Sequence, residues 1–173
     1  MIFVIGHSKT GKSPVAQRIA NHYGYPVIEA GAWARALCPA KEGEMSEEYV
    51  PRVSQAALEA LKNDPRISVR HVVSHLSTTT GPCLIVGIRN PFDFANLVDP
   101  TKDHVIFIES DVPLSDFEQE GITLIQGMVK MYATVFRHPP LTLRAPHPDT
   151  HESWGIYLDK MAEIAIRHLG QKA

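Results

Sequence analysis

The feature that most constrains this chain is the segment Gly6–Ser13, which reads Gly-His-Ser-Lys-Thr-Gly-Lys-Ser. It fits the pattern G-x-x-x-x-G-K-[ST], the P-loop. An apolar run at 2–5 precedes it, and Val15, Ile19 and Tyr23 recur after it at helical spacing. We therefore expect a strand, a phosphate-binding loop and a helix in direct succession, which is the context that this motif requires.

The spacing of the motif brings several phosphate-binding groups together. Backbone N–H groups of such a loop surround a triphosphate, and the positive N-terminus of the next helix points at it. We expect Lys12 to contact the β- and γ-phosphates of ATP and the hydroxyl of Ser13 to bind Mg²⁺. Pro14 is tolerated in the first helical turn, where its missing N–H has no intrahelical partner. The predicted cofactor-binding residues are Gly6, His7, Ser8, Lys9, Thr10, Gly11, Lys12, Ser13 and Pro14.

Length and composition indicate the number of domains and argue against several other classes of protein. The chain has 173 residues, of which 44% are hydrophobic and 21% charged, as in a single globular domain. A net charge of −2 gives no basic field for nucleic acid, and no apolar stretch is long enough to span a bilayer. The two cysteines, Cys38 and Cys83, match neither a disulfide framework nor a metal motif. Because the first expected strand starts at Ile2, we predict no signal peptide and a cytoplasmic setting.

Strands and helices are predicted to alternate after the P-loop helix. Apolar runs predict further strands at 25–29, 83–86, 104–109 and 141–144. Helical spacing predicts helices at 33–37, 46–62, 69–76, 92–97, 122–136 and 154–169. In the third of these, Val69, Val72, Val73 and Leu76 are expected to face inward. Such alternation favours a parallel sheet covered on both faces, with ligands at the carboxyl ends of the strands.

The order of these pieces resembles the nucleoside monophosphate kinase-like branch of P-loop proteins, which includes adenylate kinases and dephospho-CoA kinases. Residues 27–35 are similar to the family's strand, turn and helix ending in an arginine that holds the acceptor's phosphate. Residues 84–91 resemble its strand followed by Asp-Gly-φ-Arg, where φ is apolar. Residues 105–113 resemble the strand and turn before the lid, and 147–150 lie where the family has an adenine-contacting loop.

This resemblance implies a three-layer α/β/α P-loop fold with a mainly parallel five-stranded sheet in the order 2-3-1-4-5. It implies one domain over 1–173, with a helical acceptor-side insertion at about 38–80 and a short or absent lid at about 111–121. The substrate-binding residues would be Gly31, Arg35 and Arg89, and the catalytic residues Lys12, Glu29 and Arg89. The implied cofactors are ATP and Mg²⁺.

The chain also departs from the family's pattern. Val86 stands where the family usually has a carboxylate that positions the Mg²⁺ shell, and Ala32 stands where many members have another acid. Glu29 is the nearest carboxylate and could take over a metal-water or base role. No arginine pair follows Asp111, where a lid would clamp the phosphoryl group, which leaves Lys130, Arg137 and Arg144 as candidates.

Two histidine pairs have spacings that metals use. His71 and His75 stand four apart on an expected helix, but no third ligand accompanies them, so we favour a solvated or half-buried pair. His147 and His151 flank Pro148 and Asp149, where capping or contact with a base is favoured over a metal. Lysines and arginines are scattered without interleaved aromatic residues, which does not indicate a nucleic-acid groove.

Three functional hypotheses follow. The first is an ATP–Mg²⁺-dependent kinase that phosphorylates a small acceptor, most simply a nucleoside or deoxynucleoside monophosphate, held between Arg35 and Arg89. The second is a non-catalytic or slowly hydrolysing NTP-binding regulatory or assembly module, supported by Val86 and the missing lid arginines. The third is a kinase for a non-nucleotide metabolite, with a pocket lined by Trp33 and Tyr49. The acceptor's identity and the oligomeric state stay open.

Overall fold

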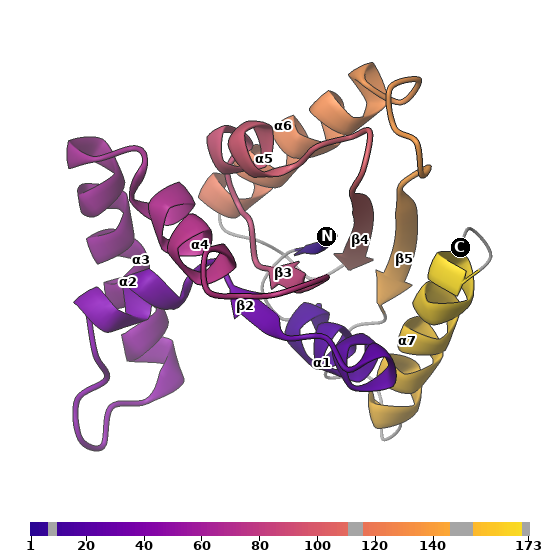
Figure 1. Ribbon diagram of the computed structural model, residues 1–173. Coiled ribbons are helices and arrows are strands. Elements are labelled where there is room, and N and C mark those ends of the chain that lie inside the picture. Colours follow the sequence, from indigo (N-terminus) through magenta and orange to yellow (C-terminus); the bar gives the residue numbers. More distant parts are fainter. Residues whose placement is uncertain (7–9, 111–115, 146–153, 171–173) are drawn as a thin grey trace.

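A computed structural model describes residues 1–6, 10–110, 116–145 and 154–170 of the chain (Figure 1). Its elements follow one another in the order β1 (Ile2–Gly6), α1 (Lys12–Tyr23), β2 (Val27–Glu29), α2 (Ala32–Leu37), α3 (Ser46–Asn63), α4 (Ile67–Leu76), β3 (Leu84–Val86), α5 (Pro91–Leu97), β4 (His104–Ser110), α6 (Asp116–Met131), β5 (Leu141–Ala145) and α7 (Trp154–Gly170). The strand expected before the P-loop is β1, and the helix expected after it is α1.

The strands form one five-stranded sheet in the order β2-β3-β1-β4-β5. Every strand pairing is parallel, with Val4 of β1 opposite Val86 of β3 and Ile106 of β4. The predicted fold class and strand order are therefore confirmed. Because all strands run the same way, their carboxyl ends lie at one edge of the sheet, and the P-loop begins at the middle of that edge.

Each face of the sheet carries its own hydrophobic core. On one face, Ile2 and Val4 of β1 pack with apolar residues of α1 and α7. On the other face, Phe3 and Ile5 pack with residues of α4, α5 and α6. Figure 1 shows the same layers, with α1 and α7 below the sheet and α4, α5 and α6 above it. Burial on both faces explains why β1, β3 and β4 are mostly continuous apolar runs, whereas the edge strand β5 alternates buried Leu143 and Ala145 with exposed Thr142 and Arg144.

Some helical details differ from the sequence-based expectations. Val73 is 50% exposed, because α4 buries Val72 fully and only half-buries Val69 and Leu76. The expectation that Val73 faces inward was wrong. The helix expected at 122–136 ends at Met131, and a turn carries the chain on to Phe136, which is buried.

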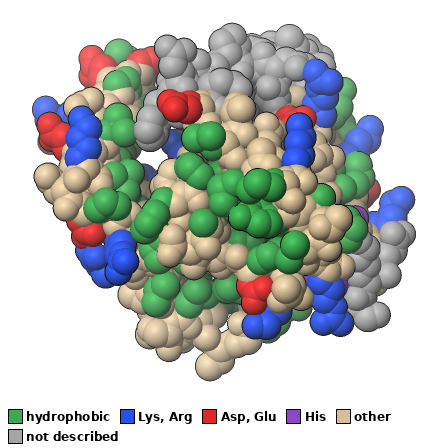
Figure 2. Space-filling view, turned by 90° about the horizontal axis from the view of Figure 1, so that it is seen from above, with side chains coloured by type: hydrophobic (Ala, Val, Ile, Leu, Met, Phe, Trp, Pro, Cys, Tyr) green, Lys and Arg blue, Asp and Glu red, His purple; other side chains and the backbone are tan. Residues whose placement is uncertain are grey.

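Helix α3 packs against α2 and α4 and buries none of its side chains fully. It lies at the side of the sheet, at the left of Figure 1. A second lightly covered region is the outer side of α6 and the turn after it. There the exposed apolar side chains are Leu124, Met131, Tyr132 and Val135. Figure 2 views the molecule from above Figure 1 and shows apolar side chains gathered near the middle of that surface.

The remaining sequence expectations concern cysteines and membranes. Cys38 and Cys83 are both buried free thiols, and burial raises the pKa of the Cys83 thiol. Cys83 is fully enclosed in the core of α4, α5 and α6, as expected of a small apolar residue. In the described part of the chain, no helix combines the length and the apolar character that crossing a membrane requires.

Candidate functional site

Two P-loop glycines lie where a side chain would not fit. A Cβ atom on Gly6 would lie 2.5 Å from the carbonyl oxygen of Ile108 on β4. Gly11 has φ of 78° and caps the N-terminus of α1, and its Cβ would lie 2.4 Å from Cδ2 of Leu158. Helix α7 therefore packs directly against the end of the loop. His7, Ser8 and Lys9 lie outside the described residues, so their predicted roles stay predictions.

Lys12 is a buried cation at the start of α1. Its residue is only 8% exposed, although lysines are almost never buried unless they have a partner. A Cβ atom on Gly87, in the turn after β3, would lie 4.0 Å from Cε of Lys12. The lysine side chain therefore runs alongside that turn. Thr10 is fully buried, Ser13 is half-buried in the first turn of α1, and Pro14 is exposed one residue later, as its position allows.

The turn that carries Arg89 is held on several sides. Gly87 has φ of 87°, a conformation that side chains rarely adopt, and Ile88 is buried in the core. Asn90 caps α5, because its Oδ1 accepts a hydrogen bond from the backbone N–H of Asp93 at 2.7 Å. A Cβ atom on Gly121 of α6 would lie 2.2 Å from the carbonyl oxygen of Arg89. Arg89 is exposed and projects from a turn with little freedom.

Glu29 and Arg35, predicted separately as catalytic and substrate-binding residues, lie beside each other. Nη2 of Arg35 is 3.7 Å from Oε2 of Glu29, with the two side chains 51% and 36% exposed. Such exposed pairs stabilise a fold by about 0–1 kcal/mol, so this pair contributes little to the stability of the protein. Gly31 caps the N-terminus of α2, and open space surrounds the position of its Cβ. Ala32 is the first residue of that helix.

The register of the sheet separates Glu29 from the other strand-end acid, Glu109. Glu29 is the direct partner of Val86, and Val86 packs into the α1 and α7 core. Neighbouring residues in register project to the same face, so Glu29 lies on the face that α1 covers. Glu109 lies on the opposite face, where its Oε1 accepts a hydrogen bond at 2.7 Å from Nε2 of Gln126 in α6. Only Glu29 shares a face with Ser13.

The three basic candidates for a lid function lie on different segments of the structure. Arg144 is the register partner of Glu109, close to the carboxyl edge of the sheet. Lys130 lies in the last turn of α6. The backbone N–H of Arg137 donates at 2.9 Å to the carbonyl of Pro100, which precedes β4 and therefore lies at the amino edge. Arg144 is the candidate that its strand position favours.

Comparisons with known proteins were made for the chain and for its structure. No protein-family model matches the chain, and no curated protein sequence matches it. Among solved structures, it is similar to a dephospho-CoA kinase from Campylobacter jejuni, with 14% identity, 96% of each chain covered and a TM-score of 0.48. It is also similar to a gluconokinase from Sinorhizobium meliloti 1021, with 17% identity, 95% of this chain and 94% of the other covered, and a TM-score of 0.42.

Sequence reasoning missed the surroundings of two polar side chains near this edge. Asp93 is 3% exposed in the first turn of α5, and burial raises the pKa of its carboxyl. The ring of His71 in α4 lies near the backbone of Glu29, while burial and its neighbour His75 lower the pKa of the ring. The Asn-Pro-x-Asp pattern at 90–93 could have indicated a helix cap. Nothing local in the sequence indicates that Asp93 is buried or that His71 contacts β2.

The remaining features predicted from the sequence are the histidine pair, the two aromatic residues of the third hypothesis and two loop segments. The rings of His71 and His75 lie 4.4 Å apart as a tilted pair. Among the described residues, no three His, Cys, Asp or Glu side chains gather as metal ligands. Trp33 is 9% exposed and so packs inside, and Tyr49 lies under the guanidinium of Arg52. The 147–150 segment, with Asp149, and residues 111–115 of the expected lid lie outside the described residues.

Proposed function

We propose that this chain is an ATP–Mg²⁺-dependent small-molecule kinase, and that its acceptor is a nucleotide such as a nucleoside or deoxynucleoside monophosphate. The observation that carries the proposal is the position of Lys12 alongside Gly87. This places the lysine of the P-loop next to the turn that presents Arg89. A cation for the donor phosphates and a guanidinium for the acceptor therefore lie at one edge of the sheet, as phosphoryl transfer requires.

The residues at this edge fit the donor. Lys12 would contact the β- and γ-phosphates, and the N-terminus of α1 would face them. The hydroxyl of Ser13, in the first turn of α1, would hold Mg²⁺. When bound, Mg²⁺ neutralises charge on the phosphate oxygens. Glu29 is the strand-end carboxylate on the face that α1 covers, so it is our candidate for orienting metal-bound water or the acceptor.

The residues at this edge also fit a phosphorylated acceptor. Arg89 is exposed on a constrained turn, and a guanidinium in fixed geometry binds phosphate with two parallel hydrogen bonds. Arg35 would bind from the other side, exchanging its weak contact with Glu29 for the acceptor's phosphate. Because catalysis of phosphoryl transfer consists mostly of positioning and charge neutralisation, Lys12 and these arginines would supply the main catalytic groups.

The test is a coupled ADP-release assay with ATP–Mg²⁺ and a panel of nucleoside and deoxynucleoside monophosphates, extended to sugars and other hydroxyl metabolites. Lys12→Ala is expected to lower kcat by about a hundredfold or more, the loss typical of removing one electrostatic stabiliser of a transition state. Lys62→Ala, at an exposed lysine in the last turn of α3, is the matched control. It should leave turnover unchanged.

The second hypothesis, a non-catalytic NTP-binding module, is favoured by Val86, a fully buried apolar residue at the end of β3. ATP binding in calorimetry that Lys12→Ala removes, without turnover on any acceptor, would establish that module and refute the kinase. Turnover limited to a non-nucleotide acceptor would instead establish the third hypothesis.

A further inference from the structure

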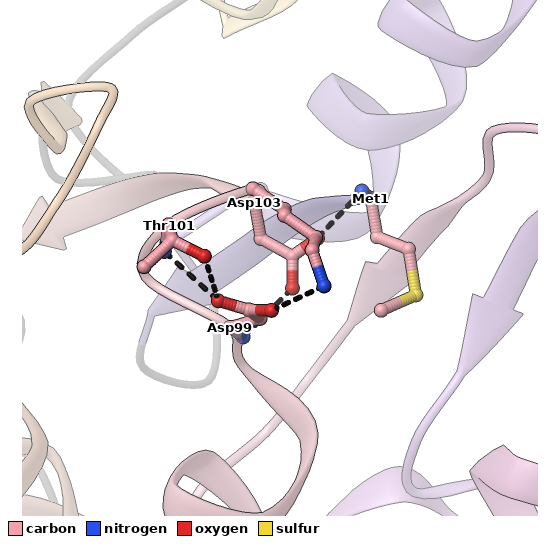
Figure 3. Close-up of polar contacts among 5 residues, drawn as sticks. Met1, Asp99, Thr101 and Asp103 are labelled. Atoms are coloured by element: carbon pink, nitrogen blue, oxygen red, sulfur yellow. Dashed lines mark hydrogen bonds and ion pairs between the residues drawn. The ribbon is translucent and has the colours of Figure 1, made fainter.

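Two aspartates in the described part of the chain are deeply buried, and only one is explained by a charge partner. Asp93 and Asp103 are each 3% exposed. Asp103 lies at the amino edge of the sheet, where its carboxylate binds the amine of Met1 at 2.7 Å and the backbone N–H of Asp99 at 2.8 Å (Figure 3). Burying a carboxylate is costly unless it is paired, and this arrangement meets the requirement.

The carboxyl of Asp93 has only neutral partners. Its Oδ2 accepts a hydrogen bond from Nδ2 of Asn90 at 2.7 Å, and the hydroxyl of Ser68 lies near enough to the same carboxyl group to oppose the effect of burial on its pKa. Its Oδ1 is buried without a hydrogen-bond partner among the described residues. Burial therefore raises the pKa of this carboxyl. Burying a carboxyl group without a cation beside it lowers the stability of the fold, and such a group is a candidate for a role other than stability.

The contact between Asp93 and Asn90 is reciprocal. The Asn90 amide donates to the carboxyl of Asp93, and Asn90 Oδ1 accepts from the backbone N–H of Asp93, both at 2.7 Å. Asn90 directly follows Arg89. Because Oδ1 and Nδ2 of Asn90 are both hydrogen-bonded to Asp93, the end of the turn from which Arg89 projects is held in place. On its other side, the turn lies directly against Gly121 of α6.

Helix α4 extends this arrangement to the second arginine. Ser68 is 3% exposed and contacts Asp93. His71 follows three residues later, on the same side of the helix, and its ring lies near the backbone of Glu29. One face of α4 therefore contacts the segment after β3 and the end of β2. These are the two places from which Arg89 and the Glu29–Arg35 pair extend.

We propose that Asp93 is a positioning residue for the acceptor: it fixes Asn90, thereby orients Arg89, and joins the Arg89 turn to α4 through Ser68. This inference rests on the proposed function, because it gives the buried carboxyl a role in binding the acceptor. A guanidinium displaced by about an ångström loses much of its effect, so removing the buried carboxyl should weaken acceptor binding about tenfold or more.

The two buried aspartates provide a matched test. Asp93→Ala and Asp103→Ala delete the same group at the same exposure, at opposite edges of the sheet. Both should lower the melting temperature. Asp93→Ala is expected to raise the acceptor KM about tenfold with the ATP KM unchanged, and Asp103→Ala should change neither KM. Asp93→Asn retains an oxygen for Asn90 and should restore part of the acceptor affinity.

A measurement that needs no turnover separates this inference from the proposed function. The backbone amide resonance of Arg89 in ¹⁵N-labelled protein should shift or broaden in Asp93→Ala and stay in place in Asp103→Ala. Ser68→Ala, a milder change, should cause a smaller shift of the same kind and serves if Asp93→Ala does not fold. An Arg89 resonance unmoved by changes at Asp93 and Ser68 overturns the inference, as do equal KM changes in the two aspartate variants. A wild-type chain without any acceptor turnover refutes the proposed kinase, and the acceptor role of Asp93 with it.

Discussion

Replacing Gly121 by alanine tests whether α6 fixes the turn that carries Arg89. Gly121 lies in α6, and a Cβ atom there would lie 2.2 Å from the carbonyl oxygen of Arg89 and 3.4 Å from its carbonyl carbon. Both atoms are backbone, so no side chain can move aside to relieve the clash. The methyl group could be accommodated only if α6 and the turn moved apart.

Gly127 offers a control in the same helix. It is exposed, and nothing lies within 4 Å of its Cβ position. In both variants the helix gains the propensity difference between glycine and alanine, about 1 kcal/mol. Gly121→Ala also incurs the cost of overpacking, about 1–3 kcal/mol. The free energy of unfolding should therefore be about 1–3 kcal/mol lower for Gly121→Ala than for Gly127→Ala.

The assays are urea denaturation and thermal melting of both variants, followed by the acceptor KM. A domain of this size changes its melting temperature by about 2–4 °C per kcal/mol. Gly127→Ala should therefore melt a few degrees above wild type, and Gly121→Ala should melt below Gly127→Ala. The acceptor KM should rise only in Gly121→Ala, since its backbone contact is to Arg89. Equal stabilisation by the two substitutions would refute the close approach of α6 to the Arg89 turn.

Two further predictions concern carboxylates. Hydrogen bonds from Arg52 and the backbone of Lys41 lower the pKa of Glu44 from its ordinary value of 4.5 to about 2, so the stability that Glu44 contributes is present above pH 4.5 and is lost as the pH falls towards 2. The melting temperature of Glu44→Gln should therefore be below that of wild type at neutral pH and converge with it by about pH 2; a constant difference would contradict the ion pair. Glu29→Gln should lower turnover and weaken the Mg²⁺ dependence of ATP binding measured by calorimetry. Adding Val86→Asp should restore part of both, and an unchanged Mg²⁺ dependence in Glu29→Gln would exclude Glu29 from the metal's surroundings.

The centre of the sheet was predictable from the sequence because β1, β3 and β4 are buried on both faces. A strand in that position needs apolar residues throughout, and the runs at 2–5, 83–86 and 104–109 therefore stand out without any periodicity. The P-loop then fixes which strand begins the fold. The strand order came from the resemblance and could not come from hydrophobicity, since an apolar run shows that a strand is buried and does not show which strands are its neighbours.

The outer helices were harder to predict in detail because they are only partly covered. Helix α3 has an apolar stripe, but it packs only against α2 and α4 and buries no side chain fully. Val73 has the spacing of an inward residue and is 50% exposed, because α4 contacts the core along a narrow strip around Val72. Periodicity gives the direction of an apolar face, and the width of the neighbouring surface decides how much of it is buried.

The residues around the site that the sequence did not reveal share a physical cause, which is contact between segments far apart in the chain. Gly121 is an ordinary helical glycine until the carbonyl of Arg89 is placed against it. His71 has the spacing of a metal ligand with His75, but its ring lies near the backbone of Glu29 in β2, more than 40 residues earlier. Asp93 has the spacing of a helix cap, and its carboxyl group lies near Ser68 of α4, a separate helix.

The register of β2 and β3 gives a physical account of the missing acid at Val86. Adjacent strands lie about 4.8 Å apart, and β3 lies between β1 and β2, so a carboxylate on β2 starts one strand spacing further from the P-loop than one at Val86 would. Glu29 is directly opposite Val86 and projects to the same face, and its side chain is one carbon longer than that of aspartate. The added methylene spans only part of that spacing. A role for Glu29 near Mg²⁺ is therefore more consistent with contact through a metal-bound water than with direct ligation, whereas an aspartate at position 86 would begin next to β1. Val86 packs into the α1 and α7 core, so its apolar side chain contributes contacts there that a carboxylate at the same position would not make.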